Sequence, residues 1–256
     1  MDFHGQRAII TGAAGSIGWD IAAALSRHGA RVLATDRDED KLKDLVAQAD
    51  EHISWRRADV REQSQVRGVV RDACEELGGA DILVNVAGIV GQSPYNEIST
   101  EEWDRMFEIN VRGTFYFIQE VGPLMCRQNH GKIVNFSSKS GKTGSALMVH
   151  YSSAKAAIIG LTQALAHELA PHKVNVNAVC PGITADTGVW SQVSSRYVTN
   201  LGLSRDEVVQ KFTGKVPLGR LAEVEDLTGV VLFLCSSWSD YMTGQAINIS
   251  GGREMH

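Results

Sequence analysis

The segment VHYSSAKAAIIGLTQALAHEL begins at Val149 and places a phenol, Tyr151, four residues before an amine, Lys155. Apolar residues recur at helical spacing from Ala154 to Leu169, so the segment is predicted to be a helix. Residues four apart lie on one helix face, with β-carbons about 5–6 Å apart. Such a pair suits general acid–base chemistry, because a neighbouring cation makes a phenol more acidic. The pair also fits a surface lysine beside a half-buried tyrosine, and other residues must decide.

A second group of residues suits dinucleotide binding. TGAAGSIG (Thr11–Gly18) follows a predicted strand and opens a predicted helix. Its glycines, Gly12, Gly15 and Gly18, let the backbone approach a ligand closely. The N-terminus of the helix behind them offers N–H groups and a partial positive charge to a pyrophosphate. The spacing differs from the common pattern, in which the first two glycines are two apart, and tight turns also use glycines.

Asp36 supports the interpretation of the glycine loop as part of a dinucleotide site. It ends the next predicted strand, about 20 residues further on, where a carboxylate binds the adenosine ribose hydroxyls. Because a carboxylate there repels a 2′-phosphate, we expect NAD to be preferred to NADP. Arg37 follows directly and weakens that preference. The alternative role for Asp36 is to cap the next helix.

Composition limits the class of protein. The chain has 256 residues, 43% of them hydrophobic, with 25 glycines and 5 prolines, which suits an α/β protein with many tight turns. The formal charge of −5 and the lack of a sustained basic patch argue against a nucleic-acid partner. There is no cluster of potential metal ligands among the four separated cysteines, which are predicted to be buried free thiols. With no signal peptide and no membrane-spanning apolar stretch in the sequence, we expect a cytoplasmic protein.

Predicted strands and helices alternate along the whole chain, which indicates one domain with a parallel sheet and helices on both faces. The predicted strands are Arg7–Thr11, Arg31–Asp36, Ile53–Asp59, Asp81–Gly88, Lys132–Ser138, Val174–Gly182 and Gln245–Ser250. The predicted helices are Ile17–His28, Asp38–Ala49, a stretch ending at Leu77, Glu101–Cys126, the segment from Val149, and Asp226–Ser236. The segment 183–215 is long and polar and lacks the alternation of strand and helix, as binding loops often do.

The motifs together resemble one family. TGAAGSIG, NVAG (Asn85–Gly88), YSSAK (Tyr151–Lys155) and PG (Pro181–Gly182) stand in the order and spacing of the short-chain dehydrogenases/reductases, and the resemblance covers essentially the whole chain. It implies a single Rossmann-type domain spanning residues 1–256, with a doubly wound parallel sheet. It also implies a homotetramer that moves hydride between NAD(P) and an alcohol or carbonyl.

The resemblance implies four catalytic residues. Tyr151 takes the place of the general acid/base, and Lys155 that of the lysine that lowers its pKa and holds the nicotinamide ribose. Ser138, thirteen residues before Tyr151, matches the serine that orients the substrate oxygen. Asn110, in FEINVRGTF, matches the asparagine that supports a proton-relay water. Ser137, beside Ser138, is expected to be structural.

The resemblance also implies a set of cofactor contacts, with Asp59 and Val60 near adenine and the backbone from Pro181 to Thr184 near the carboxamide. The predicted set is Gly12, Gly15, Ser16, Ile17, Gly18, Asp36, Asp59, Val60, Asn85, Ala87, Gly88, Tyr151, Lys155, Pro181, Gly182 and Thr184. This chain departs from the family pattern at Val86, which replaces a second asparagine. It departs again at Asp186, which stands where a threonine is common and is followed by Thr187.

For the substrate, the segments TNLGLSRDEVVQKFTGKVPLGR and YMTGQAINISGG resemble those of sugar-alcohol dehydrogenases, including the sorbitol-6-phosphate type. The residues expected to bind substrate are Ser138, Lys139, His150, Tyr151 and Trp190, with Gln192 close by. Some of these residues have a plainer alternative: His150 caps or solvates its helix, and Trp190 packs a lid against the core. A lysine like Lys142 is common in this loop across the family.

We therefore predict an NAD-dependent enzyme that interconverts a secondary alcohol and a ketone, with a sugar alcohol and a ketose as first choice. A sugar-alcohol phosphate is the second choice, and acetoin or a small diol the third. Reduction of a 3-oxoacyl carrier protein is disfavoured by Asp36, since that reaction normally uses NADPH. A non-enzymatic dinucleotide-binding regulator is the distant alternative, because it has no need for Ser138, Tyr151 and Lys155 together.

Overall fold

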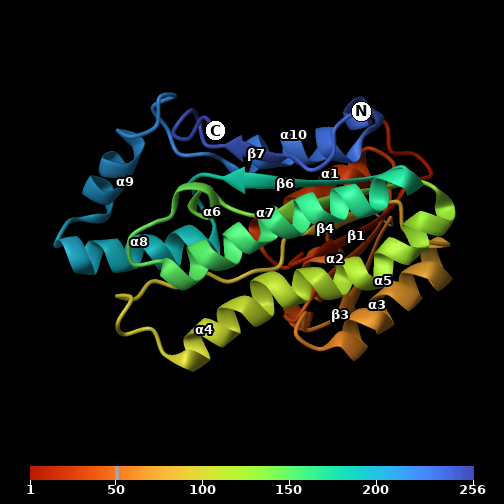
Figure 1. Ribbon diagram of the computed structural model, residues 1–256, viewed down its shortest axis with the longest axis horizontal. Helices are drawn as coiled ribbons and strands as arrows, with labels where there is room; N and C mark the ends of the chain where they lie inside the picture. Colours follow the sequence, from red (N-terminus) through yellow and green to blue (C-terminus); the bar gives the residue numbers. More distant parts are fainter. Residues whose placement is uncertain (50–51) are drawn as a thin grey trace.

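Seven parallel strands form one sheet through the centre of the protein (Figure 1). The structure is a computed structural model that describes residues 1–49 and 52–256. The strands are β1 (Arg7–Thr11), β2 (Arg31–Asp36), β3 (Ile53–Arg57), β4 (Ile82–Asn85), β5 (Gly131–Phe136), β6 (Val174–Pro181) and β7 (Ala246–Ile249). Their order in the sheet is β3-β2-β1-β4-β5-β6-β7. The predicted strands are therefore all present, and most are a residue or more shorter than expected.

Helices cover both faces of the sheet, as predicted. The main helices are α1 (Ser16–Arg27), α2 (Glu39–Val46), α3 (Gln63–Leu77), α5 (Gly113–Gln128), α7 (Val149–Leu169) and α10 (Val224–Cys235). Side chains of α1, α2 and α10 share one buried apolar cluster, and those of α3, α5 and α7 share another. Ile10 of β1 belongs to the first cluster and its neighbour Ile9 to the second. Alternate residues of a buried strand thus supply two cores.

The chain winds outward in both directions from the pair β1 and β4. β2 and β3 lie to one side of β1, and β5, β6 and β7 lie beyond β4. In a doubly wound sheet, the crevice outside the carboxyl ends of the strands at this switch point is where ligands bind. The loops after Thr11 and Asn85, which carry TGAAGSIG and NVAG, leave the sheet side by side at this edge. This single-domain architecture confirms the predicted fold.

The helix predicted over Glu101–Cys126 contains a feature that the sequence did not reveal. The structure has α4 (Thr100–Phe107), then a π-helical turn (Glu108–Arg112), and then α5. A π turn adds one residue to a helical turn, and this scarcely alters the apolar spacing from which the helix was predicted. The prediction of one long helix was therefore wrong at this point. Such π turns are frequent at functional sites, and Asn110 lies in this one.

Residues 183–215 were predicted to lack the alternation of strand and helix and to form a binding loop, and the prediction of a loop was wrong. They contain α8 (Gly188–Leu201) and α9 (Arg205–Thr213), which are shown at one end of the molecule in Figure 1. Thr187 caps α8 by accepting a hydrogen bond from the backbone N–H of Trp190 at 3.1 Å. In α9 only Val208 and Phe212 are buried, so the apolar spacing that marks a helix is weak. Together with Trp190 and Leu221, these two residues form a small separate core.

All four cysteines are free, as predicted, but only Cys180 and Cys235 are buried, while Cys74 and Cys126 are half-buried. Within the described residues, no helix combines the length and the apolar character needed to cross a lipid bilayer.

Candidate active site

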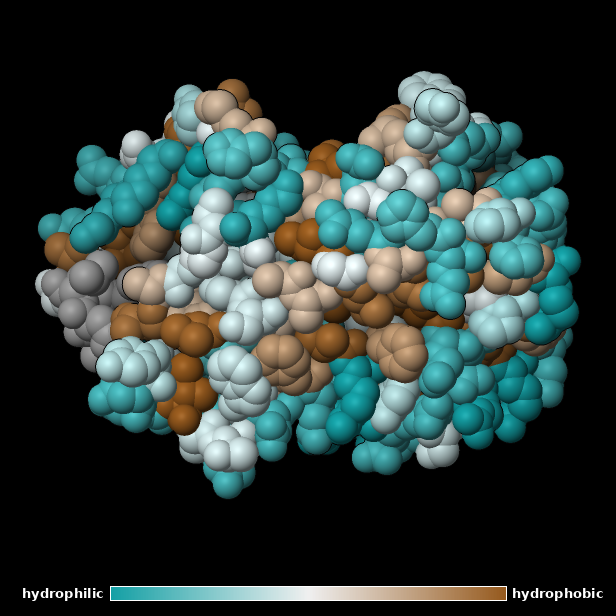
Figure 2. All heavy atoms as spheres, viewed as in Figure 1, coloured by the Kyte–Doolittle hydropathy of each residue, from teal (hydrophilic) through white to brown (hydrophobic). Residues whose placement is uncertain are grey.

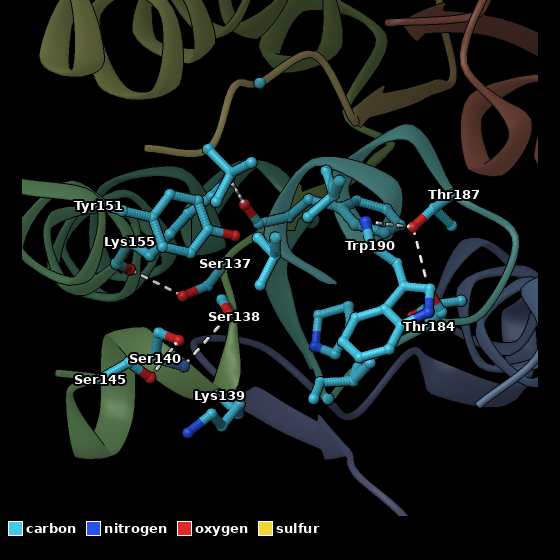
Figure 3. A pocket seen from close by; sticks show the side chains of 18 of the residues that line it. Ser137, Ser138, Lys139, Ser140, Ser145, Tyr151, Lys155, Thr184, Thr187 and Trp190 are labelled. Atoms are coloured by element: carbon cyan, nitrogen blue, oxygen red, sulfur yellow. Dashed lines mark hydrogen bonds between the residues drawn. The ribbon is translucent and has the colours of Figure 1, made fainter. Parts of the chain in front are cut away.

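A cavity lies at the carboxyl ends of β4, β5 and β6, and the four predicted catalytic residues all line it: Asn110, Ser138, Tyr151 and Lys155. Ser138 follows β5 and caps the short helix α6 (Lys139–Thr143), where its hydroxyl accepts a hydrogen bond from the N–H of Ser140 at 3.1 Å. Tyr151 and Lys155 project from the first turns of α7. Figure 3 shows both beside Ser138, with Thr184, Thr187 and Trp190 across the cavity.

Lys155 is held by the end of the sheet. Its Nζ donates a hydrogen bond to the carbonyl of Phe136 at 2.8 Å and lies 5.8 Å from the ring centre of Tyr151. The hydroxyl of Ser137 donates to the carbonyl of Lys155 at 2.7 Å, which is a structural contact between β5 and α7. At Gly141 a β-carbon would lie 2.6 Å from the carbonyl carbon of Lys155, so glycine allows α6 to pack directly on α7.

Burial governs the acid–base properties of the pair. It raises the pKa of the Tyr151 phenol above its ordinary value, and the hydrogen bond with Ser138 acts in the opposite direction. Burial lowers the pKa of Lys155 to about 8, so most of this amine is still charged at pH 7. We expected the cation to lower the pKa of Tyr151. In the protein alone, burial outweighs any such effect.

Asn110 ties the π turn to the loop after β4. Its amide nitrogen donates to the carbonyls of Ile89 and Met106 at 3.1 and 3.0 Å, and its amide oxygen faces the N–H of Ile89 at 3.3 Å. A β-carbon at Gly88 would lie 2.6 Å from that oxygen and 3.4 Å from Nζ of Lys155. Only glycine therefore lets the NVAG loop pass this close to the two polar side chains.

A long cleft adjoins the cavity and holds most of the predicted cofactor residues. Those that line the cleft are Gly12, Gly15, Ser16, Ile17, Gly18, Asp36, Asp59, Val60, Ala87 and Gly88. Pro181, Gly182 and Thr184 line the catalytic cavity instead. No side chain caps the N-terminus of α1, so its first N–H groups face the cleft without a capping partner. Gly12 has a φ of +67°, and a β-carbon there would lie 2.7 Å from the N–H nitrogen of Ala87. This cradle fits the pyrophosphate of a dinucleotide.

Asp36 is fixed at the far end of the cleft. One carboxylate oxygen accepts the N–H of Ala14 and the other the N–H of Asp38, both at 3.1 Å. The side chain that caps α2 is Asp38, so the alternative role of Asp36 as a helix cap was wrong. Arg37 and Lys41 line the same part of the cleft and bring positive charge near the carboxylate.

The cleft and the catalytic cavity are neighbours that share part of their lining. The residues that line both are Ile17, Val86, Gly88, Ile89, Val90, Thr187 and Val189. No group of His, Cys, Asp or Glu side chains suited to a metal ion occurs in the described part of the chain.

Two predicted contacts, Asn85 and His150, lie elsewhere, and so does Asp186. Asn85 is buried in a chain of amides, donating to Asn135 at 2.9 Å, and lines neither space. His150 is fully buried, with Nε2 3.2 Å from a carboxylate oxygen of Glu102, and also lines neither. Adjacent residues on a helix point in different directions, so His150 faces away while Tyr151 faces the cavity. Asp186 is exposed and lies outside both spaces, whereas Thr184 and Thr187 line the cavity.

The side of the cavity remote from Lys155 is formed by α8, α9 and the C-terminal segment. Trp190 lines it and packs edge-on against Phe212, with ring centres 5.9 Å apart, so its role in packing is confirmed and its contact with substrate stays a prediction. Lys139 lines the cavity, but Lys142 lines a different one. Sequence reasoning missed Phe212 and Arg253, which complete this wall. No local pattern marks them, because only the tertiary fold brings them there.

Comparison with known proteins agrees with this geometry. A family model described as enoyl-(acyl carrier protein) reductase matches residues 12–254. Galactitol 2-dehydrogenase of Agrobacterium fabrum is 37% identical over the whole of both chains, and sorbitol dehydrogenase of Cereibacter sphaeroides is 36% identical over the same extent. The chain belongs to the short-chain dehydrogenase/reductase family, and it is an oxidoreductase of alcohol and ketone groups.

Two solved structures extend the comparison. A variant of actinorhodin polyketide ketoreductase with NADPH matches with a TM-score of 0.94 and 32% identity, covering 98% of both chains. NAD⁺-bound xylitol dehydrogenase matches with a TM-score of 0.92 and 32% identity, covering 98% of this chain and 100% of that one. The class of cofactor is therefore NAD(P).

The contact between Ser138 and Tyr151 leads to a testable prediction. Burial raises the pKa of Tyr151 and the hydrogen bond with Ser138 lowers it. The Ser138→Ala variant loses this bond, so the pKa of Tyr151 is expected to rise further above its ordinary value. Ultraviolet difference titration of tyrosinate measures it, with Tyr151→Phe identifying the signal among the five tyrosines. A phenol that titrates at the same or lower pH in the Ser138→Ala variant would contradict the hydrogen bond.

Proposed function

We propose that this enzyme oxidises a secondary hydroxyl of a polyhydroxy alcohol to a ketone, with NAD as the hydride acceptor, and catalyses the reverse reaction. One observation carries the proposal: the cavity that holds Ser138, Tyr151 and Lys155 adjoins, and shares lining residues with, a cleft that contains Asp36. A sugar alcohol and a ketose are the favoured pair, because the similar proteins include enzymes named for galactitol, sorbitol and xylitol.

In the oxidation, bound NAD supplies the site that accepts hydride. Tyr151, in its phenolate form, accepts the hydroxyl proton as the general base, a role worth roughly 10²–10⁴ in rate. Ser138 donates a hydrogen bond to the substrate oxygen, where negative charge develops. The ammonium of Lys155 lies beside Tyr151 and favours the phenolate. Asn110, in the π turn, holds the loop after β4 through its hydrogen bonds with the backbone of Ile89.

The first experiment follows NADH formation with galactitol, sorbitol and xylitol, and with a small diol and a 3-hydroxyacyl thioester for comparison. Turnover of a polyol that exceeds that of the thioester by at least about tenfold, or roughly 1.4 kcal/mol in activation free energy, supports the proposal. Turnover of the thioester alone would identify a carrier-protein reductase and contradict it.

Tyr151→Phe is expected to reduce kcat by about 10²-fold or more, because phenylalanine cannot accept the proton. NAD should still bind, since the phenol oxygen contributes little to the cleft where the cofactor binds. The two measurements are steady-state kcat and calorimetric titration with NAD. A variant that keeps more than a few per cent of its activity would refute the role of Tyr151.

Asp36→Ala is expected to reduce the ratio of kcat/KM with NAD to that with NADP by about tenfold or more. The variant loses a charge-assisted hydrogen bond to the ribose and the repulsion of a 2′-phosphate. Arg37 and Lys41, which line the same end of the cleft, then favour the phosphate. An unchanged ratio would show that other groups select the cofactor.

We also propose that the enzyme is a homotetramer and that helices α4, α5 and α7 form contacts between subunits. Figure 2 shows apolar residues in a band across the face formed by α5 and α7. Exposed apolar side chains on these three helices are Trp103, Phe115 and Val149, which are 38%, 39% and 43% exposed. Exposed apolar surface of this kind favours association.

Light scattering at micromolar protein concentration tests this proposal and should give four times the mass of the 27.8 kDa chain. Phe115→Glu is the matched variant, because it places a charge in the proposed contact without touching the cavity. A monomeric mass for the unaltered protein would contradict the proposed assembly.

A further inference from the structure

Two half-buried cations lie at the end of the cavity remote from Lys155. The side chains of Lys139 and Arg253 are only 14% and 16% exposed, and both line the cavity. Both contact the same carboxylate oxygen of Glu254: Nζ of Lys139 is 3.7 Å from it, and Nε of Arg253 is 3.5 Å from it. Glu254 does not line the cavity, so it lies in the wall behind the two cations.

The charges in this wall do not balance. Among the described residues, the lining of the cavity includes the cations Lys139, Lys155 and Arg253 but no Asp or Glu. Glu254 balances one of the two remote cations, which leaves a net charge of +1 at this end. Burial and the charge of Arg253 lower the pKa of Lys139, while Glu254 acts against them. Two cations therefore share one carboxylate at this end of the cavity.

The groups without a hydrogen-bond partner at this end include donors, together with one buried acceptor, Oε2 of Glu254. Within the described part of the chain, no hydrogen bond leaves the Nη atoms of Arg253, whose guanidinium carbon lies 5.7 Å from the ring centre of Phe212. Lys215 lies 5.8 Å from the same ring and adds positive charge outside the cavity. A neutral polyol would use some of these donors but would leave the excess charge unpaired. Carboxylates and phosphates match both the charge and the donors.

We propose that the preferred substrate is a polyhydroxy alcohol that carries an anionic group, a carboxylate or a phosphate ester, bound by Lys139 and Arg253. The reacting hydroxyl lies at Tyr151 and the anion at the opposite end of the same cavity. The inference rests on the proposed function, since it specifies the substrate class of that site. It also assigns Lys139 and Arg253 as the residues that determine specificity.

The test compares D-sorbitol, D-gluconate and D-sorbitol 6-phosphate as substrates with NAD. We expect kcat/KM for at least one anionic compound to exceed that for sorbitol by about tenfold or more, because the anion forms charge-assisted hydrogen bonds that sorbitol cannot form. Comparing kcat/KM for gluconate with that for sorbitol 6-phosphate shows whether the site prefers a carboxylate or a phosphate. Calorimetric binding of the three compounds to the NAD-loaded Tyr151→Phe variant measures recognition without turnover.

Single variants locate the effect. Lys139→Met and Arg253→Met should each lower the ratio of anionic to neutral kcat/KM by about tenfold. Glu254→Gln removes the competing carboxylate and should raise the ratio, whereas a merely structural role for this cluster predicts a fall in all three variants. Lys142→Met, on the same short helix but lining another cavity, is the matched control and should leave the ratio unchanged.

The outcomes separate the two proposals. If sorbitol is the best substrate, or if the preference for an anion survives in both Lys139→Met and Arg253→Met, the inference is wrong while the proposed function stands. If anionic compounds bind but none of the three is oxidised, the anion site stands and the proposed function fails. If none binds and none is oxidised, both are wrong.

Discussion

The position of one buried ammonium group, that of Lys155, constrains the rest of the site. Removing such a charge from water costs several kcal/mol unless it is hydrogen-bonded, and the carbonyl of Phe136 at the end of β5 supplies that bond at 2.8 Å. The bond fixes α7 against the sheet, and Tyr151 one turn earlier is fixed with it. The Ser137 hydroxyl, which donates to the Lys155 carbonyl, secures the same junction from the other side.

The parallel sheet connects this junction to the cofactor cleft. β1 and β4 are neighbours that end at the same edge, so the glycine loop and the NVAG loop lie together there. Gly88, the last residue of the NVAG loop, lies against the side chains of Asn110 and Lys155, where a β-carbon would not fit. A site of this kind depends on backbone positions as much as on side chains, which explains why glycines recur around it.

Local patterns in the sequence predicted the sheet and the positions of the glycine loop and Asp36, and the family resemblance pointed to Asn110, Ser138, Tyr151 and Lys155, which the structure brings to one cavity. The sequence did not predict α8 and α9, since the apolar spacing there is weak. The resemblance placed Asn85 beside the cofactor, and the expected polyol pocket included His150, whereas their side chains face Asn135 and Glu102. Sequence reasoning missed Arg253 and Phe212, because approach between the C-terminal segment and α6 or α9 is a property of the folded chain alone.

Direct hydride transfer requires a carbinol at Tyr151 and a nicotinamide in the adjoining cleft to come into contact, and transfer of deuterium is the sharpest test of that contact. The enzyme is incubated with NAD and a polyol deuterated at its carbinol carbons, and the reduced cofactor is examined by NMR. We expect one deuterium at the reactive carbon of the nicotinamide and a slower rate than with the unlabelled polyol. Reduced cofactor without deuterium would contradict direct transfer, because hydrogen would then reach the cofactor by another route.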